Sequence, residues 1–228
     1  MHRTDPRIGW KVGGEGRTRL AFAAVAWMLL MAVLAGTTPG AAEAQVTWET
    51  PRLLGTDVPR GLGAYYADFG ALGGDGTGVL VTWTGALAEG LRLRGGWAEG
   101  AGGDGAGFGG LDLWRPLTDR TEELPVDVVW TSGIGVGHGA WTLVSVPVGL
   151  SAGRSLQEGP VWISPWVHAG VVFDLQLGNE APEDEFRVGV ATDLGVHVSF
   201  DEARRVVLSA SAGLGDRQAW AVGLVLRP

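Results

Sequence analysis

The residues from Glu185 to Asp201 read EFRVGVATDLGVHVSFD, and every second one is apolar or threonine. The alternate positions hold only small or polar residues: Arg187, Gly189, Ala191, Asp193, Gly195, His197 and Ser199. A period of two predicts an extended strand with one apolar face and one small or charged face. Such a strand must place its apolar face either against a protein core or against lipid.

Segments with the same alternation recur along the chain, separated by Gly, Asp and Pro, which is typical of an all-β protein. No helical period of useful length interrupts them. We predict ten strands: Gly61–Ala71, Gly78–Leu87, Leu91–Ala98, Ala106–Arg115, Leu124–Val136, Trp141–Gly153, Val161–Leu175, Phe186–Phe200, Arg205–Gly213 and Ala219–Arg227.

The alternate strand positions that are not apolar, which we call the small phase, indicate whether the apolar face of the barrel points toward lipid or toward a core. A strand face in water is normally rich in Lys, Glu, Thr and Gln, whereas here it is mostly Gly, Ala and Ser with single charges. Such residues suit the crowded interior of a narrow barrel. The sequence therefore predicts that the apolar phase faces lipid. Six Trp residues near predicted strand ends fit an aromatic girdle at the membrane interfaces: Trp97, Trp114, Trp141, Trp162, Trp166 and Trp220.

The first 44 residues are predicted to be a cleavable signal peptide. Basic residues from Arg3 to Arg19 precede the apolar run LAFAAVAWMLLMAVLAG, and small residues follow at Ala42 and Ala44. An uncleaved membrane anchor is the alternative, because the apolar run approaches spanning length. Cleavage after Ala44 leaves a lead-in over residues 45–60, without clear periodicity, and a barrel over residues 61–228.

Composition excludes several kinds of function. Without the leader the chain has 12 basic and 22 acidic residues, a formal charge of −10, which argues against nucleic acid as a partner. The same residues contain no Lys, so a Schiff base and a P-loop lysine are excluded. The absence of Cys excludes a thiol nucleophile and a thiolate metal site. The His residues show no ligand spacing, so we predict no metal and no cofactor.

On these patterns the chain from Gly61 onward resembles the small bacterial outer-membrane β-barrel proteins with eight or ten strands. The last strand, AWAVGLVLRP, has the alternating apolar pattern of that class, but Pro228 stands where the class often has an aromatic residue. The resemblance implies a closed antiparallel transmembrane β-barrel, ten-stranded with eight as the alternative, that is monomeric and contacts outer-membrane lipid. Three prolines within predicted strands, Pro125, Pro147 and Pro165, require strand ends or bulges, and a bulge would reverse the facing beyond it.

Charged residues on the small phase are predicted to form an ion-pair network in the lumen. The candidates are Asp68, Arg92, Arg94, Asp112, Asp127, His168, Asp174, Arg187, Asp193, His197 and Arg205. A hairpin centred at Glu180–Ala181 would place three pairs opposite each other: Asp174 with Arg187, His168 with Asp193, and Ser164 with His197. We expect contact in at least one of the first two pairs. The His–Asp pair with a nearby Ser also raises the alternative of a barrel-borne hydrolase, but a bracing pair is favoured.

The connections between strands fall into two sets, which is typical of outer-membrane barrels. The set predicted to lie outside the cell is rich in Gly and in acids, namely Asp75, Glu99, Asp104, Glu180, Glu183, Asp184, Glu185 and Asp216, against Arg217 alone. This charge predicts divalent cations or a cationic surface partner. The leading hypothesis is a non-enzymatic protein with a structural or surface-interaction role. The further alternatives are a narrow passive pore, which Tyr66, Trp114 and Trp166 would obstruct, and a soluble periplasmic β-barrel that binds an apolar ligand.

Overall fold

The computed structural model describes residues 47–69, 76–85, 88–99, 105–118, 125–139, 141–178, 186–214 and 217–227. All ten predicted strands are present, with ends that differ by a few residues from the prediction, and one short strand, β7, was not predicted. The strands are β1 (Gly61–Asp68), β2 (Thr77–Thr84), β3 (Leu91–Glu99), β4 (Gly105–Thr118), β5 (Asp127–His138), β6 (Thr142–Gly153), β7 (Leu156–Glu158), β8 (Val161–Leu177), β9 (Phe186–Ser199), β10 (Val206–Leu214) and β11 (Ala219–Leu226).

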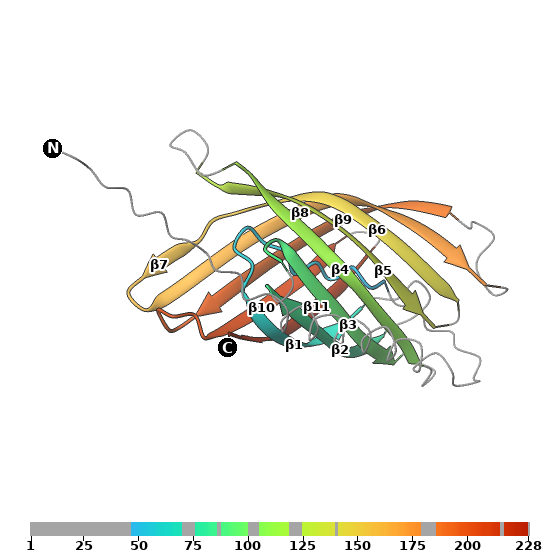
Figure 1. Cartoon of the computed structure of the whole chain (residues 1–228), viewed down its shortest axis with the longest axis horizontal. Coiled ribbons are helices and arrows are strands. Elements are labelled where there is room, and N and C mark those ends of the chain that lie inside the picture. The colour runs from blue at the N-terminus through green and yellow to red at the C-terminus, as the bar shows by residue number, and fades with distance from the viewer. Residues whose placement is uncertain are drawn as a thin grey trace.

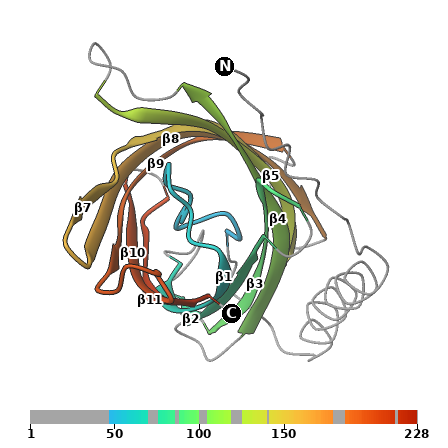
Figure 2. The same cartoon turned by 60° about the vertical axis from the view of Figure 1, so that its left-hand side comes forward.

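The strands close into a ten-stranded antiparallel barrel, as the alternation predicted. Neighbours along the chain pair with one another, β6 pairs directly with β8, and β1 pairs with β11 to complete the ring (Figures 1 and 2). The three-residue β7 pairs only with the first residues of β8 and stands beside the ring. Among the described residues, no helix is long and apolar enough to cross a membrane.

The two ends of the barrel carry different connections. The loop end is the end at which β1–β2, β3–β4, β5–β6, β8–β9 and β10–β11 are joined. The terminal end carries the other connections together with the start of β1 and the end of β11, where Leu62 pairs with Leu226. An even number of strands brings the start of β1 and the end of β11 to the same end of the barrel.

The outer wall of the barrel is apolar, whereas the inner wall is mostly small or polar and also carries large buried apolar side chains such as Leu80, Phe108 and Val225. Outward side chains such as Val79, Val190 and Leu224 are 43–61% exposed, and on β2, β9 and β11 they alternate with inward residues that are mostly buried. The predicted facing is therefore confirmed for these strands. Pro147 and Pro165 lie within β6 and β8 without any shift of register, so neither reverses the facing. A register shift occurs instead at Pro116 to Thr118, at the end of β4.

Strand β1 corrects the prediction, because its two phases are reversed. The inward residues are Gly61, Gly63, Tyr65 and Ala67, with Tyr65 only 4% exposed, whereas Tyr66 is 52% exposed. Asp68 shares the outward phase with Tyr66 and is therefore not a lumen residue. The sequence GLGAYYAD carries a tyrosine and small residues in both phases, so its alternation does not identify the inner face.

Two of the Trp residues assigned to the girdle also lie elsewhere. Trp97 and Trp220 face outward near the loop end, 43% and 42% exposed. Trp162 and Trp166, in contrast, point into the lumen and are 2% and 3% exposed. Position near a strand end was the basis of the prediction, and it says nothing about which phase of the strand a residue occupies.

The segment before β1 runs inside the barrel, which the sequence did not predict. In Figure 2 this blue segment lies within the ring of strands. Residues 47–55 are all buried, including Trp48, Leu53 and Leu54 at 0% exposure. We call residues 47–60 the plug. The predicted signal peptide, residues 1–44, lies outside the described residues, and its cleavage stays a prediction.

Candidate functional site

The plug runs through the lumen from the loop end to the terminal end. Near the loop end, Glu49 forms an ion pair with Arg217, which lies between β10 and β11. Midway, the carbonyl oxygen of Leu54 accepts a hydrogen bond from Ser151 of β6 at 2.6 Å. At the terminal end, Asp57 pairs with Arg204 at 2.9 Å and Arg60 pairs with Glu89 at 2.8 Å. The plug therefore contacts the wall along its whole length.

Trp48 occupies a seat made of glycines on two strands. Cβ atoms added at Gly110 of β4 and at Gly133 and Gly135 of β5 would lie 2.5–3.0 Å from atoms of the indole ring. Real Cβ atoms do not approach so closely, so only glycine leaves room for the ring. The alternating glycines of GIGVGHG thus have a packing role, and the small phase of the barrel wall is matched to an aromatic side chain of the plug.

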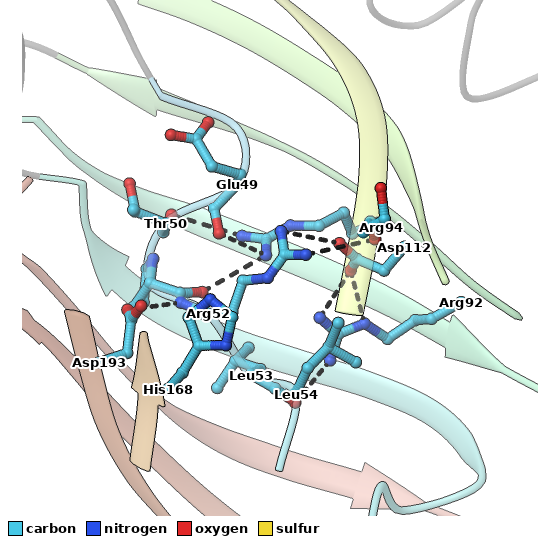
Figure 3. A network of polar contacts seen from close by, with 12 residues as sticks. Glu49, Thr50, Arg52, Leu53, Leu54, Arg92, Arg94, Asp112, His168 and Asp193 are labelled. Atoms are coloured by element: carbon cyan, nitrogen blue, oxygen red, sulfur yellow. Dashed lines mark hydrogen bonds and ion pairs between the residues drawn. The ribbon is translucent and has the colours of Figure 1, made fainter. Parts of the chain in front are cut away.

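Two arginines of the wall bind the main chain of the plug. Arg92 of β3 donates to the carbonyl oxygen of Leu53 at 2.8 Å, and Arg94 donates to that of Glu49 at 3.1 Å (Figure 3). The guanidinium of Arg94 also lies over the Trp48 ring, 5.7 Å from its centroid. Because a segment without secondary structure leaves its carbonyl groups unpaired, these arginines supply the hydrogen bonds that the buried plug needs.

Asp112 of β4 lies between arginines of the wall and of the plug. Its carboxylate accepts hydrogen bonds from Arg92 at 2.6 and 2.9 Å and forms an ion pair with Arg52 at 3.4 Å. The backbone N–H of Arg52 donates to Asp193 of β9 at 2.9 Å. Arg52 thereby connects opposite parts of the barrel wall, as Figure 3 shows for Asp112 and Asp193.

The described lumen contains balanced charge. The buried arginines are Arg52, Arg92, Arg94 and Arg217, and the buried carboxylates are Glu49, Asp112, Asp174 and Asp193. Burying an unpaired charge is costly, whereas paired and hydrogen-bonded charges are tolerated. The plug supplies one member of each sign, Glu49 and Arg52. Withdrawing it leaves Arg92 with Asp112 and Arg217 with Asp174, but it removes the hydrogen-bond partners of Arg94 and Asp193.

Arg217 closes the network at the loop end. It forms ion pairs with both Glu49 of the plug and Asp174 of β8, and Asp174 also accepts a hydrogen bond from Ser145 of β6 at 2.6 Å. Burial alone would lower the pKa of Arg217, but the two carboxylates outweigh it and raise that pKa. The guanidinium therefore keeps its charge and holds the plug against the wall.

The two lumen histidines bond to serines of neighbouring strands. His168 Nδ1 lies 3.0 Å from Ser151 Oγ, and His197 Nδ1 bonds to Ser209 Oγ. Ser151 donates its own proton to the plug carbonyl of Leu54, and the ring of Trp162 stacks parallel to that of His197 at 6.5 Å. Because the Ser151 proton is already donated to a carbonyl group, the contact between His168 and Ser151 braces the wall and the plug.

The predicted site residues separate into three groups. Arg92, Arg94, Asp112, His168, Asp174, Asp193 and His197 are buried in the lumen. Asp68 and Asp127 are half-buried, Asp68 on the outward phase of β1 and Asp127 at the start of β5 on its inward phase. Arg187 and Arg205 are exposed, which corrects their assignment to the lumen. Arg187 is the second residue of β9, at the loop end, and Arg205 directly precedes β10. Both have the inward phase of their strands, but they lie too near the ends of the wall to be buried.

The register predicted for the β8–β9 hairpin is observed. Asp174 lies opposite Arg187, His168 opposite Asp193, and Ser164 opposite His197. The contacts of the buried side chains come from elsewhere, because Asp174 pairs with Arg217 and Asp193 bonds to the plug. Sequence reasoning missed Glu49 and Arg52, which lie in an aperiodic segment, and placed Arg217 on the surface. The alternating glycines of β5, Gly133 and Gly135, were the feature of the sequence that could have indicated a bulky group inside the barrel.

Within the described residues, no three His, Cys, Asp or Glu side chains are grouped so as to hold a metal ion. No protein-family model matches the sequence, and no curated protein matches it either. Among solved structures, the chain is similar to Ail, the attachment invasion locus protein of Yersinia pestis, which was crystallised with the heparin analogue sucrose octasulfate. The two share 14% identity over 73% of this chain and 93% of that chain, with a TM-score of 0.27. A likeness this loose assigns no function.

Proposed function

We propose that this protein is a non-enzymatic barrel of the bacterial outer membrane that is closed by its own N-terminal plug and has a structural or surface-interaction role. The observation that carries the proposal is the combination of an apolar outer wall with a lumen filled by residues 47–60. Lipid satisfies the apolar wall, and the closed ring leaves no strand edge along the membrane. A filled lumen favours a support or binding role over passage of solutes.

The orientation follows from the connections. The terminal end faces the periplasm and the loop end faces outward, as in bacterial barrels with an even number of strands. Among the acids predicted for the outer surface, only Glu99 lies in the described part of the chain, where it is exposed. Arg217, the one base predicted there, is turned inward onto Glu49 and Asp174. Its charge is thus already neutralised, which supports divalent cations or a cationic partner at the acidic loops.

The proposal is tested first by cell fractionation of the full-length protein. We expect the protein in the outer-membrane fraction, extractable by detergent but not by high salt or alkaline carbonate. Recovery of the processed chain in the soluble periplasm would refute the membrane location. The soluble alternative requires an apolar interior that a ligand can enter. The apolar cluster inside this barrel is occupied by Trp48 and Leu53 of the plug, and Val79, Val190 and Leu224 face outward.

A gated pore is the second candidate, and one observation favours it. Several buried polar atoms of the plug have no hydrogen-bond partner among the described residues, including Trp48 Nε1, Glu49 Oε2 and Arg52 Nε. Each such atom costs about 1–3 kcal/mol when water is excluded. An imperfectly bonded plug is easier to hydrate and withdraw than an apolar one. Planar-bilayer recordings separate the candidates: a permanently closed barrel shows no conductance steps, and a gated pore shows rare ones.

The hydrolase alternative finds no support in the geometry. His168 and His197 are buried behind the plug at 2% and 1% exposure, so a substrate does not reach them while the plug is in place. A serine nucleophile needs a His that accepts its proton. Ser151 instead donates to the carbonyl oxygen of Leu54, and Asp193 accepts from the backbone of Arg52.

A further inference from the structure

A pocket of about 200 Å³ lies at the terminal end of the barrel, between the last residues of the plug and the wall. It is lined by Asp57 and Arg60 of the plug, by Trp162 and Val207 of the wall, and by Arg204 and Arg227 beside the wall. Two of the plug contacts described above, Asp57 with Arg204 and Arg60 with Glu89, involve residues that line this pocket. The pocket lies at the opposite end of the barrel from the outer loops.

The lining carries an excess of positive charge from three separate parts of the chain. Arg60 precedes β1, Arg204 lies in the turn between β9 and β10, and Arg227 follows β11. Asp57 is the one acid among the lining residues, and Arg60 has a second carboxylate nearby in Glu89. Arg204 and Arg60 are paired with these two carboxylates, whereas no carboxylate of the described residues pairs with Arg227, and the positive charge of Arg227 favours a negatively charged group here.

Arg204 is held in a defined position within this pocket. Its guanidinium lies over the Trp162 ring, 4.2 Å from the centroid, and pairs with Asp57, which also accepts a hydrogen bond from Ser155 at 2.9 Å. The backbone of Arg204 has a φ of 50°, a left-handed conformation that residues other than glycine rarely adopt. Asn or Gly would fit this turn with less strain, so the position uses its arginine side chain.

We infer that this pocket binds a small oxyanion, a carboxylate or a phosphate group, attached to an apolar or aromatic body. The arginines supply charge-assisted hydrogen bonds to the anion. Val58, Pro59 and Val207 supply an apolar wall for the rest of the ligand. The terminal end is also where the barrel meets the inner leaflet, so the same chemistry has two sources, a free periplasmic anion and an anionic lipid headgroup. The pocket is present wherever the barrel resides, whereas the two ligand sources rest on the proposed location in the outer membrane.

Isothermal titration calorimetry of the folded full-length barrel in a neutral detergent tests the inference. The probes are benzoate and phenyl phosphate for a free anion, and a short-chain phosphatidylglycerol for a headgroup. The variant is Arg227→Gln, which removes an exposed arginine of the pocket without touching the plug. Its matched control is Arg205→Gln. Arg205 is an exposed arginine between β9 and β10, at the same end of the barrel, and it does not line the pocket. The variant Arg204→Asn keeps a residue suited to the left-handed backbone and removes the guanidinium.

We expect Arg227→Gln and Arg204→Asn each to weaken binding about tenfold or more, and Arg205→Gln to leave it unchanged. Binding of the aromatic anions identifies a free periplasmic ligand, and binding of the lipid alone identifies a headgroup; both outcomes support the site. Absence of heat with all three probes at millimolar concentration would overturn it. Equal losses in Arg227→Gln and Arg205→Gln would also overturn it, since that result indicates unspecific attraction to a basic rim.

Discussion

Replacing Trp48 by alanine tests whether the plug is what closes the barrel. The indole ring is fully buried on a seat formed by the backbones of β4 and β5. Removing a buried Trp side chain costs about 3–5 kcal/mol, and the cost is higher where the surroundings cannot collapse into the space. The seat belongs to two hydrogen-bonded strands of a closed ring, which restricts such a collapse. We therefore expect the upper part of that range.

This cost acts on the docking of the plug rather than on the barrel wall. At about 1.4 kcal/mol for each factor of ten, the upper part of that range raises the population with the plug withdrawn by roughly three to three and a half powers of ten. Withdrawal leaves a lumen lined with Arg92, Arg94 and Asp112, which water and ions can enter. In planar bilayers, Trp48→Ala should open far more often than the wild-type protein.

Trypsin provides a second readout, because it cleaves after arginine and Arg52 is 1% exposed while the plug is docked. The control is Trp220→Ala, which removes a Trp that is 42% exposed on the outer wall and far from the plug. Both variants must first be shown to fold, by the shift in electrophoretic mobility on heating. A folded Trp48→Ala barrel that is as silent as the wild type, with Arg52 equally protected, would refute the role assigned to the plug.

Three further predictions follow from the same contacts. Gly135→Ala places a Cβ atom 2.5 Å from the Trp48 ring, so it should expose Arg52 to trypsin at a cost of about 1–3 kcal/mol; Gly109→Ala, whose nearest neighbour lies at 3.9 Å, should not. Asp112→Asn leaves Arg92 and Arg52 buried without their carboxylate and should lower the free energy of unfolding in urea by about 3–5 kcal/mol, whereas Glu89→Gln in the exposed pair with Arg60 should change it by less than about 1 kcal/mol. The Asp201 carboxylate accepts hydrogen bonds from the backbone N–H groups of Arg205 and Val206, which lower its pKa. Because the folded pKa lies below the unfolded one, this contact stabilises the β9–β10 turn above about pH 4 and is lost as the pH falls through the lowered value. The amide shift of Arg205 in an NMR titration should report a midpoint below the usual Asp range; a midpoint at the usual value would contradict this.

The alternation in the sequence is enough to predict the wall of the barrel. A period of two and a small second phase are local properties, because each residue's facing follows from its neighbours two positions away. They were sufficient for the ten strands, for the apolar exterior and for the register of the β8–β9 hairpin. They failed in β1, where tyrosines occupy both phases and only packing against the lumen selects Tyr65 over Tyr66.

The segment that fills the barrel could be identified only from the tertiary structure. Residues 47–60 have no period, and their partners, Arg92, Asp112, Asp193 and Arg217, lie far away in the sequence. No local pattern predicts such contacts. Alternation also does not predict the position of a residue along the barrel axis. For this reason Arg187 and Arg205 were predicted to lie in the lumen, and Arg217 outside it. Alternation along a strand predicts whether a side chain faces inward or outward. Whether an inward side chain contacts the plug or lies beyond the end of the wall depends on the closure of the ring and the tilt of its strands.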